Sequence, residues 1–407
     1  MRIWIVNHYA QMPSEAGLTR DHALSWPLVQ RGHEVTIVSS AFHHRTRTSS
    51  LAPGESSRVE TSDGITFVRL ATPPYRDNGA ARFWNMVQFG QQVRHHPVVR
   101  GLPRPDVIVG SSPHLFSAWA GEYWARKYRV PFVLEVRDVL PAVYVSVGGY
   151  SPHHPAIVAL GRLEQYLYRR ARRIITPLSA LDDYLAGCGV PRERVVWIPN
   201  GVDLSLVPPV TPAPAGERLQ VIYAGAFGPA NDLGTVLEAA ALLKAQGWEA
   251  RLGFTFIGDG HQRAMLEERA HTRGLGNVVF RDAVPKAEIY PLLSASDIGL
   301  LHVMALPEFK YGISPNKLFD YMAVGRPVVC AATTPDDPVR RAGAGLSVPS
   351  QDPPALAAAL RKLAEMSPEQ RDEIGRRGRQ FVEQQHSFGI LSRQFEAALE
   401  AAVAEGV

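Results

Sequence analysis

The stretch SPNKLFDYMAVGRPVV at residues 314–329 is the most informative part of this chain. It predicts a polar turn, a short amphipathic helix with an acid in its early turns, a Gly-Arg-Pro break and a buried strand. Backbone N–H groups at the amino end of a helix attract phosphate. A carboxylate one turn further along, at Asp320, can accept hydrogen bonds from a ribose diol. One short element can therefore hold both halves of a nucleoside diphosphate, and an ordinary surface helix is the alternative for this stretch alone.

The rest of the second half repeats a strand that runs into a glycine turn. Gly225 and Gly258 each directly follow such an apolar run. The runs that predict strands in this half are 221–224, 254–257, 278–280 and 298–301. Strands that alternate with helices and end in glycines indicate a doubly wound parallel sheet, whose ligand lies at the carboxyl ends of the strands.

The first half predicts another α/β domain. Its expected strands are Ile3–Val6, Val35–Val38, Ile65–Leu70, Val107–Val109, Phe132–Val136, Ile174–Thr176 and Val195–Ile198, and its first helix is Arg20–Gln30. The proline-rich run at 207–216 fits neither a central strand nor a helix, so we place the boundary there. The predicted domains are residues 1–206 and 207–378, with a last helix at about 379–407 that packs back on the first domain.

Composition excludes several classes of protein. The chain has 407 residues, of which 45% are hydrophobic and 20% charged, so it is an ordinary globular protein with room for two domains. Its two cysteines, Cys188 and Cys330, provide no disulfide framework and suit a reducing cytoplasm. We expect neither a signal peptide nor a transmembrane helix. Residues 1–200 carry 23 Lys and Arg against 15 Asp and Glu, which favours an anionic partner for the first half.

The chain resembles the retaining glycosyltransferases of family 4, which have the GT-B fold. The motifs that carry the resemblance are Arg31–Thr36, Glu135–Asp138, Ile198–Asp203, Gly258–Gly260 and Asn316–Val329. Within that family the chain looks like the bacterial enzymes that build O-antigen and capsule repeat units. The resemblance implies an α/β fold of two Rossmann-like domains facing a central cleft, an acceptor-binding first domain and a second domain that binds a nucleotide sugar.

The resemblance also implies a set of donor-binding residues. Backbone groups at Asn316–Leu318 and the charge of Lys317 would hold the diphosphate, and Asp320 the ribose. The base would lie beside Arg281–Val284, and Arg20 is either a further phosphate contact or a surface arginine. The complete expected set is Gly17, Arg20, Gly225, Gly228, Gly258, Val284, Asn316, Lys317, Leu318 and Asp320.

Two positions depart from the family pattern. Gly312 stands where the first glutamate of a paired-glutamate motif is expected to meet the donor sugar, and Glu308 is four residues away from that position. Phe227 and Asn231 occupy a loop that often carries an arginine and a lysine for the diphosphate. Lys310 is among the cations left to offset the missing charge.

On the acceptor side, the expected catalytic residues are Arg137, Asp138 and His114. Arg137 and Asp138 follow a buried strand, where an exposed ion pair is the alternative, and His114 follows another strand, where a structural role is the alternative. We expect no metal and no cofactor, because Asp182–Asp183 and Asp336–Asp337 are adjacent pairs rather than Asp-x-Asp motifs. GT-B enzymes usually replace the cation with helix amino ends and basic side chains.

Residues 76–100 mix aromatic residues with arginines, as in a helix that lies in a membrane interface. Packing of Phe83, Trp84 and their neighbours in a protein core is the alternative. We therefore expect a cytoplasmic protein peripheral to the inner face of the membrane. The resemblance implies a UDP-sugar donor, a lipid-linked or other hydroxyl acceptor and no nucleic acid. The competing functions are transfer to a soluble small molecule, nucleotide-sugar epimerisation and, least favoured, nucleotide binding without catalysis.

Overall fold

The computed structural model describes residues 1–15, 19–77, 79–146, 148–212, 216 and 218–406. Its internal contacts divide the chain into two compact units. The first unit is Met1–Pro199 with Phe388–Val407, and the second unit is Asn200–Ser387. Each unit has its own sheet and its own apolar core, so each is described separately.

The first unit contains one eight-stranded sheet. Its strands are β1 (Arg2–Val6), β2 (Glu34–Ser40), β3 (Ser57–Ser62), β4 (Ile65–Leu70), β5 (Val107–Ser111), β6 (Phe132–Glu135), β7 (Arg173–Thr176) and β8 (Val195–Trp197). They lie in the order β3-β4-β2-β1-β5-β6-β7-β8. The pairs are parallel except β3 with β4, which are joined by the Asp63-Gly64 turn and run antiparallel.

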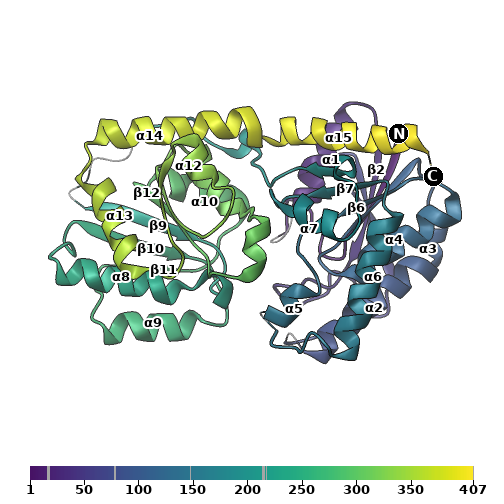
Figure 1. Ribbon diagram of the computed structural model, residues 1–407, viewed down its shortest axis with the longest axis horizontal. Helices are drawn as coiled ribbons and strands as arrows, with labels where there is room; N and C mark the ends of the chain where they lie inside the picture. Colours follow the sequence, from purple (N-terminus) through teal and green to yellow (C-terminus); the bar gives the residue numbers. More distant parts are fainter. Residues whose placement is uncertain (16–18, 78, 147, 213–215, 217, 407) are drawn as a thin grey trace. The chain divides into compact units, whose positions relative to one another are not determined.

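Helices cover both faces of this sheet. They are α1 (Arg20–Gln30), α2 (Ala80–His95), α3 (Pro97–Arg100), α4 (Leu115–Tyr128), α5 (Ala142–Ser146), α6 (Pro155–Arg170), α7 (Leu181–Gly187) and α15 (Phe388–Glu405). Ile3 and Ile5 of β1 point toward α1 and α15, and they share a buried cluster with Leu399. Trp4 points the other way and meets Trp124 of α4 edge-on, with the ring centroids 5.9 Å apart. On that face α2, α4 and α6 lie side by side (Figure 1).

The second unit contains a six-stranded sheet in which every pair is parallel. Its strands are β9 (Leu219–Ala224), β10 (Leu252–Ile257), β11 (Val278–Arg281), β12 (Ile298–His302), β13 (Val328–Ala331) and β14 (Gly345–Val348), in the order β11-β10-β9-β12-β13-β14. Its helices are α8 (Leu233–Ala245), α9 (Arg263–Thr272), α10 (Lys286–Ser294), α11 (Asn316–Ala323), α12 (Pro338–Ala342), α13 (Pro353–Glu365) and α14 (Pro368–Phe381).

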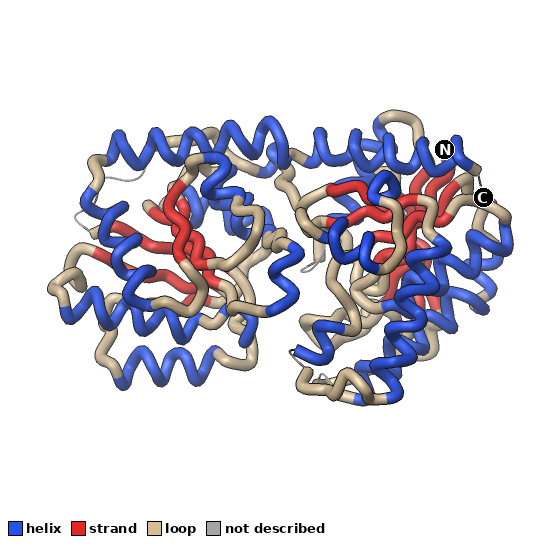
Figure 2. Tube along the Cα trace, viewed as in Figure 1, coloured by secondary structure: helices blue, strands red, loops and turns tan. Residues whose placement is uncertain are grey.

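Alternate residues of the central strands supply two separate cores in this unit. Val329 and Ala331 of β13 pack with α8, α9 and α13. Val328 and Cys330 of the same strand pack with α10, α11, α12 and the end of α14. This alternation follows from the two-residue period of a strand. Figure 2 shows the strands of each unit lying between helices, which confirms the predicted pair of doubly wound α/β domains.

The units divide at Pro199, earlier than the predicted boundary at residue 206. Asn200 donates its backbone N–H to Ser314 Oγ over 2.8 Å, and the Val202 N–H donates to the carbonyl of His386. Val202 and Val207 also pack in the second core. The segment between 200 and 207 therefore belongs to the second unit, because these hydrogen bonds and apolar contacts join it there. The prediction was guided by proline content, which marks an extended segment but not its contacts.

Both sheets have a topological switch point, where consecutive connections leave in opposite directions. It lies between β1 and β5 in the first unit and between β9 and β12 in the second. Ligands of open α/β sheets bind outside the carboxyl ends of the strands at such points. The strand order therefore predicts that the ligand site of each unit lies in the loops after these four strands.

The helix expected to lie in a membrane interface is for the most part a packed helix. Met86, Phe89 and Val93 of α2 are buried, and the guanidinium of Arg94 lies over the rings of Trp119 and Tyr123. These side chains therefore belong to the core, which corrects the prediction for most of the segment. The exposed fractions of Phe83 and Trp84 are 42% and 54%.

Candidate functional site

Close backbone packing at the switch point of the second unit requires two of the predicted glycines. A Cβ at Gly258, after β10, would lie 1.9 Å from the carbonyl oxygen of Gly225, after β9. A Cβ at Gly225 would lie 2.8 Å from Lys317 Nζ. A Cβ at Gly228 would meet nothing nearer than 4.0 Å, so packing does not explain that glycine. Any larger residue at 225 or 258 would displace the loop or the lysine.

Lys317 is held in a fixed position over the end of β9. Its Nζ donates to Tyr223 Oη and to Asn231 Oδ1, both over 2.8 Å, and it lies 4.2 Å from the centroid of the Tyr223 ring. Tyr223 Oη and Asn231 Nδ2 both donate to the carbonyl of Ala226. Asn231, which the sequence presents only as a departure from the family pattern, therefore helps to position the lysine.

Asn316, Lys317 and Leu318 form the first turn of α11, whose amino end no described side chain caps. The backbone N–H of Leu318 donates to the carbonyl of Pro315, and its side chain is fully buried. Its predicted contact with the diphosphate therefore has no support in this geometry. Asn200 fixes the turn before the helix, because its backbone N–H donates to Ser314 Oγ and its Nδ2 to the Ser314 carbonyl.

Asp320 lies on α11, and both of its carboxylate oxygens have donors. Lys286 Nζ is 2.5 Å from Oδ2, and Tyr290 Oη donates to Oδ1 over 3.1 Å. Only 6% of Asp320 is exposed, and each oxygen retains a further lone pair for a ligand hydroxyl. Lys286 begins α10 just after the Arg281–Val284 loop predicted for the base, and Val284 packs against the same core as Leu318. The sequence did not indicate Lys286 or Tyr290.

Gly312 has a backbone reason to be glycine. It ends the 3₁₀ turn Pro307–Tyr311 with φ of 103°, a conformation that side chains with a Cβ disfavour. Glu308 lies in that turn, and its Oε2 is buried without a hydrogen-bond partner among the described residues. A carboxylate is thus present in the segment where the family glutamate is missing, four residues earlier.

At the switch point of the first unit, Arg20 is buried in an ion pair. Its Nε donates to Glu135 Oε1 over 2.9 Å, and its two terminal nitrogens donate to the carbonyls of Pro199 and Ile198. Ser111 Oγ donates to the other oxygen of Glu135 over 2.6 Å. Burial opposes ionisation of Glu135, but Arg137, Arg20 and these hydrogen bonds lower its pKa. Arg20 is therefore neither the surface arginine nor the open phosphate contact that the sequence suggested, since these contacts bind it within the first unit.

A second buried carboxylate adjoins this pair. Asn7, directly after β1, donates its Nδ2 to Asp21 Oδ2 over 2.8 Å, and Arg137 Nη1 lies 3.9 Å from the same oxygen. Burial and then the charge of Glu135 raise the pKa of Asp21 to about 6. Asp138 is exposed beside them. Arg137 and Asp138 thus follow a buried strand, as predicted. Asn7, Asp21 and Glu135 were missed, although Asn7 directly follows one predicted strand and Glu135 lies within another.

His114 caps a helix and pairs with another histidine. Its Nδ1 accepts the Ser117 N–H at the start of α4, and its Nε2 lies 2.6 Å from His8 Nδ1. Burial and the charge of Arg82 lower the pKa of His114 to about 3. His114 is therefore neutral. Because its Nδ1 accepts a hydrogen bond, its single ring proton is on Nε2, which donates to His8 Nδ1. This geometry supports the structural alternative for His114 and gives a proton transfer role no support.

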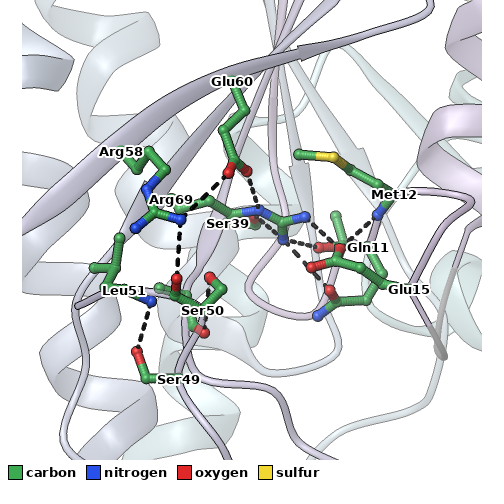
Figure 3. Close-up of polar contacts among 12 residues, drawn as sticks. Gln11, Met12, Glu15, Ser39, Ser49, Ser50, Leu51, Arg58, Glu60 and Arg69 are labelled. Carbon is green, nitrogen blue, oxygen red and sulfur yellow. Dashed lines mark hydrogen bonds and ion pairs between the residues drawn. The ribbon is translucent and has the colours of Figure 1, made fainter.

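Gly17 lies outside the described residues, but the loop that leads to it is anchored. Arg69 of β4 is 1% exposed. Its Nη1 donates to the carbonyl of Ala10 over 2.9 Å and to Ser39 Oγ over 3.1 Å, and its Nη2 binds Glu15. Figure 3 shows these contacts converging on the guanidinium. Arg69 thus fixes the course of the chain just before residue 16.

Two features are absent from the described residues. No helix there is long and apolar enough to cross a membrane. No three His, Cys, Asp or Glu side chains of that part of the chain are grouped so that they could hold a metal ion.

Two doubly wound α/β units, each with polar side chains collected near its switch point, define a two-domain α/β protein whose ligands are expected at the carboxyl ends of the strands. Residues 22–201 match the family model of the glycosyl transferase 4-like domain, and residues 218–366 match that of glycosyl transferases group 1. The chain therefore belongs to the glycosyltransferases built from these two domains, and the resemblance to family 4 is confirmed.

Curated relatives are distant. The chain is 26% identical over 240 residues to the putative colanic acid biosynthesis glycosyltransferase WcaL of Escherichia coli K12, and the match covers 58% of each protein. It is 27% identical over 389 residues to the D-inositol 3-phosphate glycosyltransferase of Kineococcus radiotolerans, covering 87% of this chain and 83% of that one. The match thus spans little more than half of the first relative.

Solved structures share the fold. Sucrose-phosphate synthase from Thermosynechococcus elongatus aligns over 100% of both chains with a TM-score of 0.78 and 18% identity. HepE of Anabaena, solved in complex with UDP-glucose, aligns over 98% of this chain and 99% of its own with a TM-score of 0.67 and 15% identity. These similarities confirm the GT-B fold.

Proposed function

We propose that the protein transfers a sugar, with retention of configuration, from a nucleoside diphosphate sugar to a lipid-linked acceptor during assembly of a bacterial surface polysaccharide. One observation carries the donor half of this proposal. Lys317 and Asp320 lie one turn apart on α11, each held by buried partners, at the switch point where the strand order directs a ligand.

The chemistry follows from the charge that develops on the leaving group. Loss of a nucleoside diphosphate leaves negative charge on its phosphates, and prepositioned donors stabilise that charge at little cost in reorganisation. Lys317 and the amino end of α11 supply such donors, while Asp320 orients the ribose. Because Tyr223 and Asn231 already fix Lys317, its side chain loses little further freedom when the diphosphate binds.

The relatives guide the choice of substrates. HepE has been solved with UDP-glucose, which supports a UDP-sugar as donor. WcaL is named for colanic acid biosynthesis, which supports a surface polysaccharide. We place the reaction at the cytoplasmic face of the membrane, with Arg137 and Asp138 of the first unit on the acceptor side and no metal required.

A soluble acceptor is the second candidate. It is favoured by the D-inositol 3-phosphate glycosyltransferase, whose name gives a small phosphorylated polyol and whose match covers most of both chains. Turnover of UDP-sugar with extracted membrane lipid but not with small polyols supports the first candidate, and the reverse supports the second. Donor consumption with neither acceptor points instead to an epimerase.

The test of the donor site compares nucleotides in a calorimeter. Lys317→Ala should weaken UDP binding at least tenfold and leave uridine binding nearly unchanged, because the nucleoside lacks the phosphates. Lys362→Ala is the matched control, since Lys362 is an exposed lysine on α13 of the same unit. Equal UDP affinity in parent and Lys317→Ala would refute the proposed cradle. A screen of UDP, GDP, TDP and ADP by thermal shift then identifies the base.

A further inference from the structure

A basic cavity lies at the amino ends of the strands in the first unit's sheet, whereas the candidate site lies at their carboxyl ends. Its volume is about 230 Å³. The residues that line it lie at or just before the amino ends of β6, β7 and β8, or in the carboxyl-terminal halves of α4 and α6. Asn7, Ser111 and Glu135 lie at or after the carboxyl ends of strands in the same sheet. The cavity is thus separate from every candidate site residue described above.

Five arginines line this cavity, with a single carboxylate among them. They are Arg126, Arg169, Arg170, Arg172 and Arg194, and the carboxylate is Glu122. Arginine stays charged at any physiological pH. Glu122 is buried and accepts from Arg170 Nε over 3.1 Å, with Arg126 Nε 3.8 Å from the same oxygen. One carboxylate therefore serves two of the arginines.

The other three arginines have no such compensation. Within the described part of the chain no ion pair involves Arg169, Arg172 or Arg194, whereas the nearby Arg173 pairs with Glu405 and Arg192 with two aspartates. Arg172 donates one N–H to the carbonyl of Gly406 over 2.9 Å. Arg169 lies in the last turn of α6, where a positive charge also stabilises the helix. Arg172 and Arg194 are not in α-helices, so this role does not account for them. Like charges gathered around one cavity repel each other unless an anion lies between them.

We propose that this cavity binds a phosphate or diphosphate group. Guanidinium groups bind phosphate oxygens through paired hydrogen bonds, which makes arginine the residue suited to such a site. The cavity is smaller than the roughly 300–1,000 Å³ of pockets that enclose drug-sized ligands. It therefore fits a small anion or the headgroup of an anionic lipid rather than a whole nucleotide sugar.

The test uses the full chain and a pair of substitutions that break no ion pair. Pyrophosphate is titrated into the parent, into Arg169→Gln with Arg194→Gln, and into Arg162→Gln, with saturating UDP present to occupy any donor site. Arg162 is exposed on α6 two turns before Arg169 and does not line the cavity, so it is a matched control. The double variant should bind pyrophosphate at least tenfold more weakly, and the control should match the parent. Circular dichroism checks folding, and Arg169→Gln alone replaces the pair if the pair misfolds.

A second arm identifies the source of the phosphate. Sedimentation is measured with vesicles of phosphatidylcholine containing phosphatidic acid and with vesicles of phosphatidylcholine alone. Binding to the acidic vesicles that the double variant loses identifies a lipid headgroup, and pyrophosphate binding without vesicle binding identifies a soluble anion. Absence of both in the parent, or equal losses in the double variant and Arg162→Gln, would overturn the site.

Discussion

Asp320 makes the sharpest prediction at the scale of single residues. Its carboxylate is buried against Lys286 and Tyr290, so replacement by Asn keeps the shape and removes the charge. We expect Asp320→Asn to weaken UDP binding by about 1–3 kcal/mol, the usual effect of losing a charged hydrogen-bonding partner. Calorimetry with UDP measures the change.

Asp336→Asn is the control for this substitution. Asp336 pairs with Arg341 of α12 rather than with Lys286 or Tyr290, so its replacement should leave UDP affinity as it is. Unchanged affinity in a folded Asp320→Asn protein would remove the ribose assignment, since charge and hydrogen bonding at that position would then not matter to the ligand.

The sequence predicted Lys317 and Asp320 because both lie in one short motif. Their partners could not be predicted in the same way, because Lys286 is 34 residues from Asp320 and Tyr223 is 94 residues from Lys317. Arg20 and Glu135 are separated by 115 residues. Such pairs depend on which strands become neighbours, and composition and periodicity do not determine that.

Among the elements, we expect the contact between α6 and α7 to depend on pH. Glu164 of α6 is buried and accepts from Tyr168 Oη over 2.8 Å and from Tyr184 Oη of α7 over 3.1 Å. Burial outweighs these hydrogen bonds and raises the pKa of Glu164 to about 7. A carboxyl whose pKa is raised on folding stabilises the protein below its unfolded pKa, and that stabilisation is lost as pH rises through the folded pKa.

Glu164→Gln should therefore remove part of the pH dependence of stability. Between pH 5 and pH 8 the parent should lose up to about 3 kcal/mol of unfolding free energy that the variant keeps, since one pKa unit corresponds to about 1.4 kcal/mol. Urea unfolding of both proteins at the two pH values gives the difference. The exposed Glu193→Gln serves as control, and parallel pH profiles for parent and Glu164→Gln would contradict the prediction.

Element prediction succeeded where periodicity and burial agreed. The helix Arg20–Gln30 and the strand Ile65–Leu70 are confirmed. β3 was missed because Ser57–Ser62 is an edge strand with few apolar residues. α2 was interpreted from its composition, but the faces of a helix differ, and the side that carries Met86, Phe89 and Val93 is buried.

The distribution of charge over the whole molecule bears on whether the protein binds a membrane. The first 200 residues hold the positive excess, and Phe83 and Trp84 are exposed on α2 of that unit. Phe83→Ser with Trp84→Ser should weaken binding to phosphatidylglycerol vesicles several-fold, because aromatic side chains anchor proteins at the headgroup level. UDP affinity should not change, and added salt should weaken vesicle binding of the parent.

Trp26→Ser is the matched control for the membrane experiment, because Trp26 is an exposed aromatic residue on α1 of the same unit. Phe83 also contacts Phe116 edge-on, so Trp84→Ser alone separates loss of a membrane contact from loss of packing. Equal vesicle binding by Trp84→Ser and the parent would favour a soluble acceptor.

The last prediction concerns how the whole molecule neutralises a diphosphate. Its adjacent acidic pairs have other partners, since Asp182 and Asp183 both bind Arg192 and Asp336 binds Arg341. The charge of the diphosphate would instead meet Lys317 and the amino end of α11, which act without a cation. Sugar transfer should therefore continue at an undiminished rate in excess EDTA. Activity that EDTA abolishes and Mg²⁺ or Mn²⁺ restores would show that these groups do not suffice, and that a cation joins them on the phosphates.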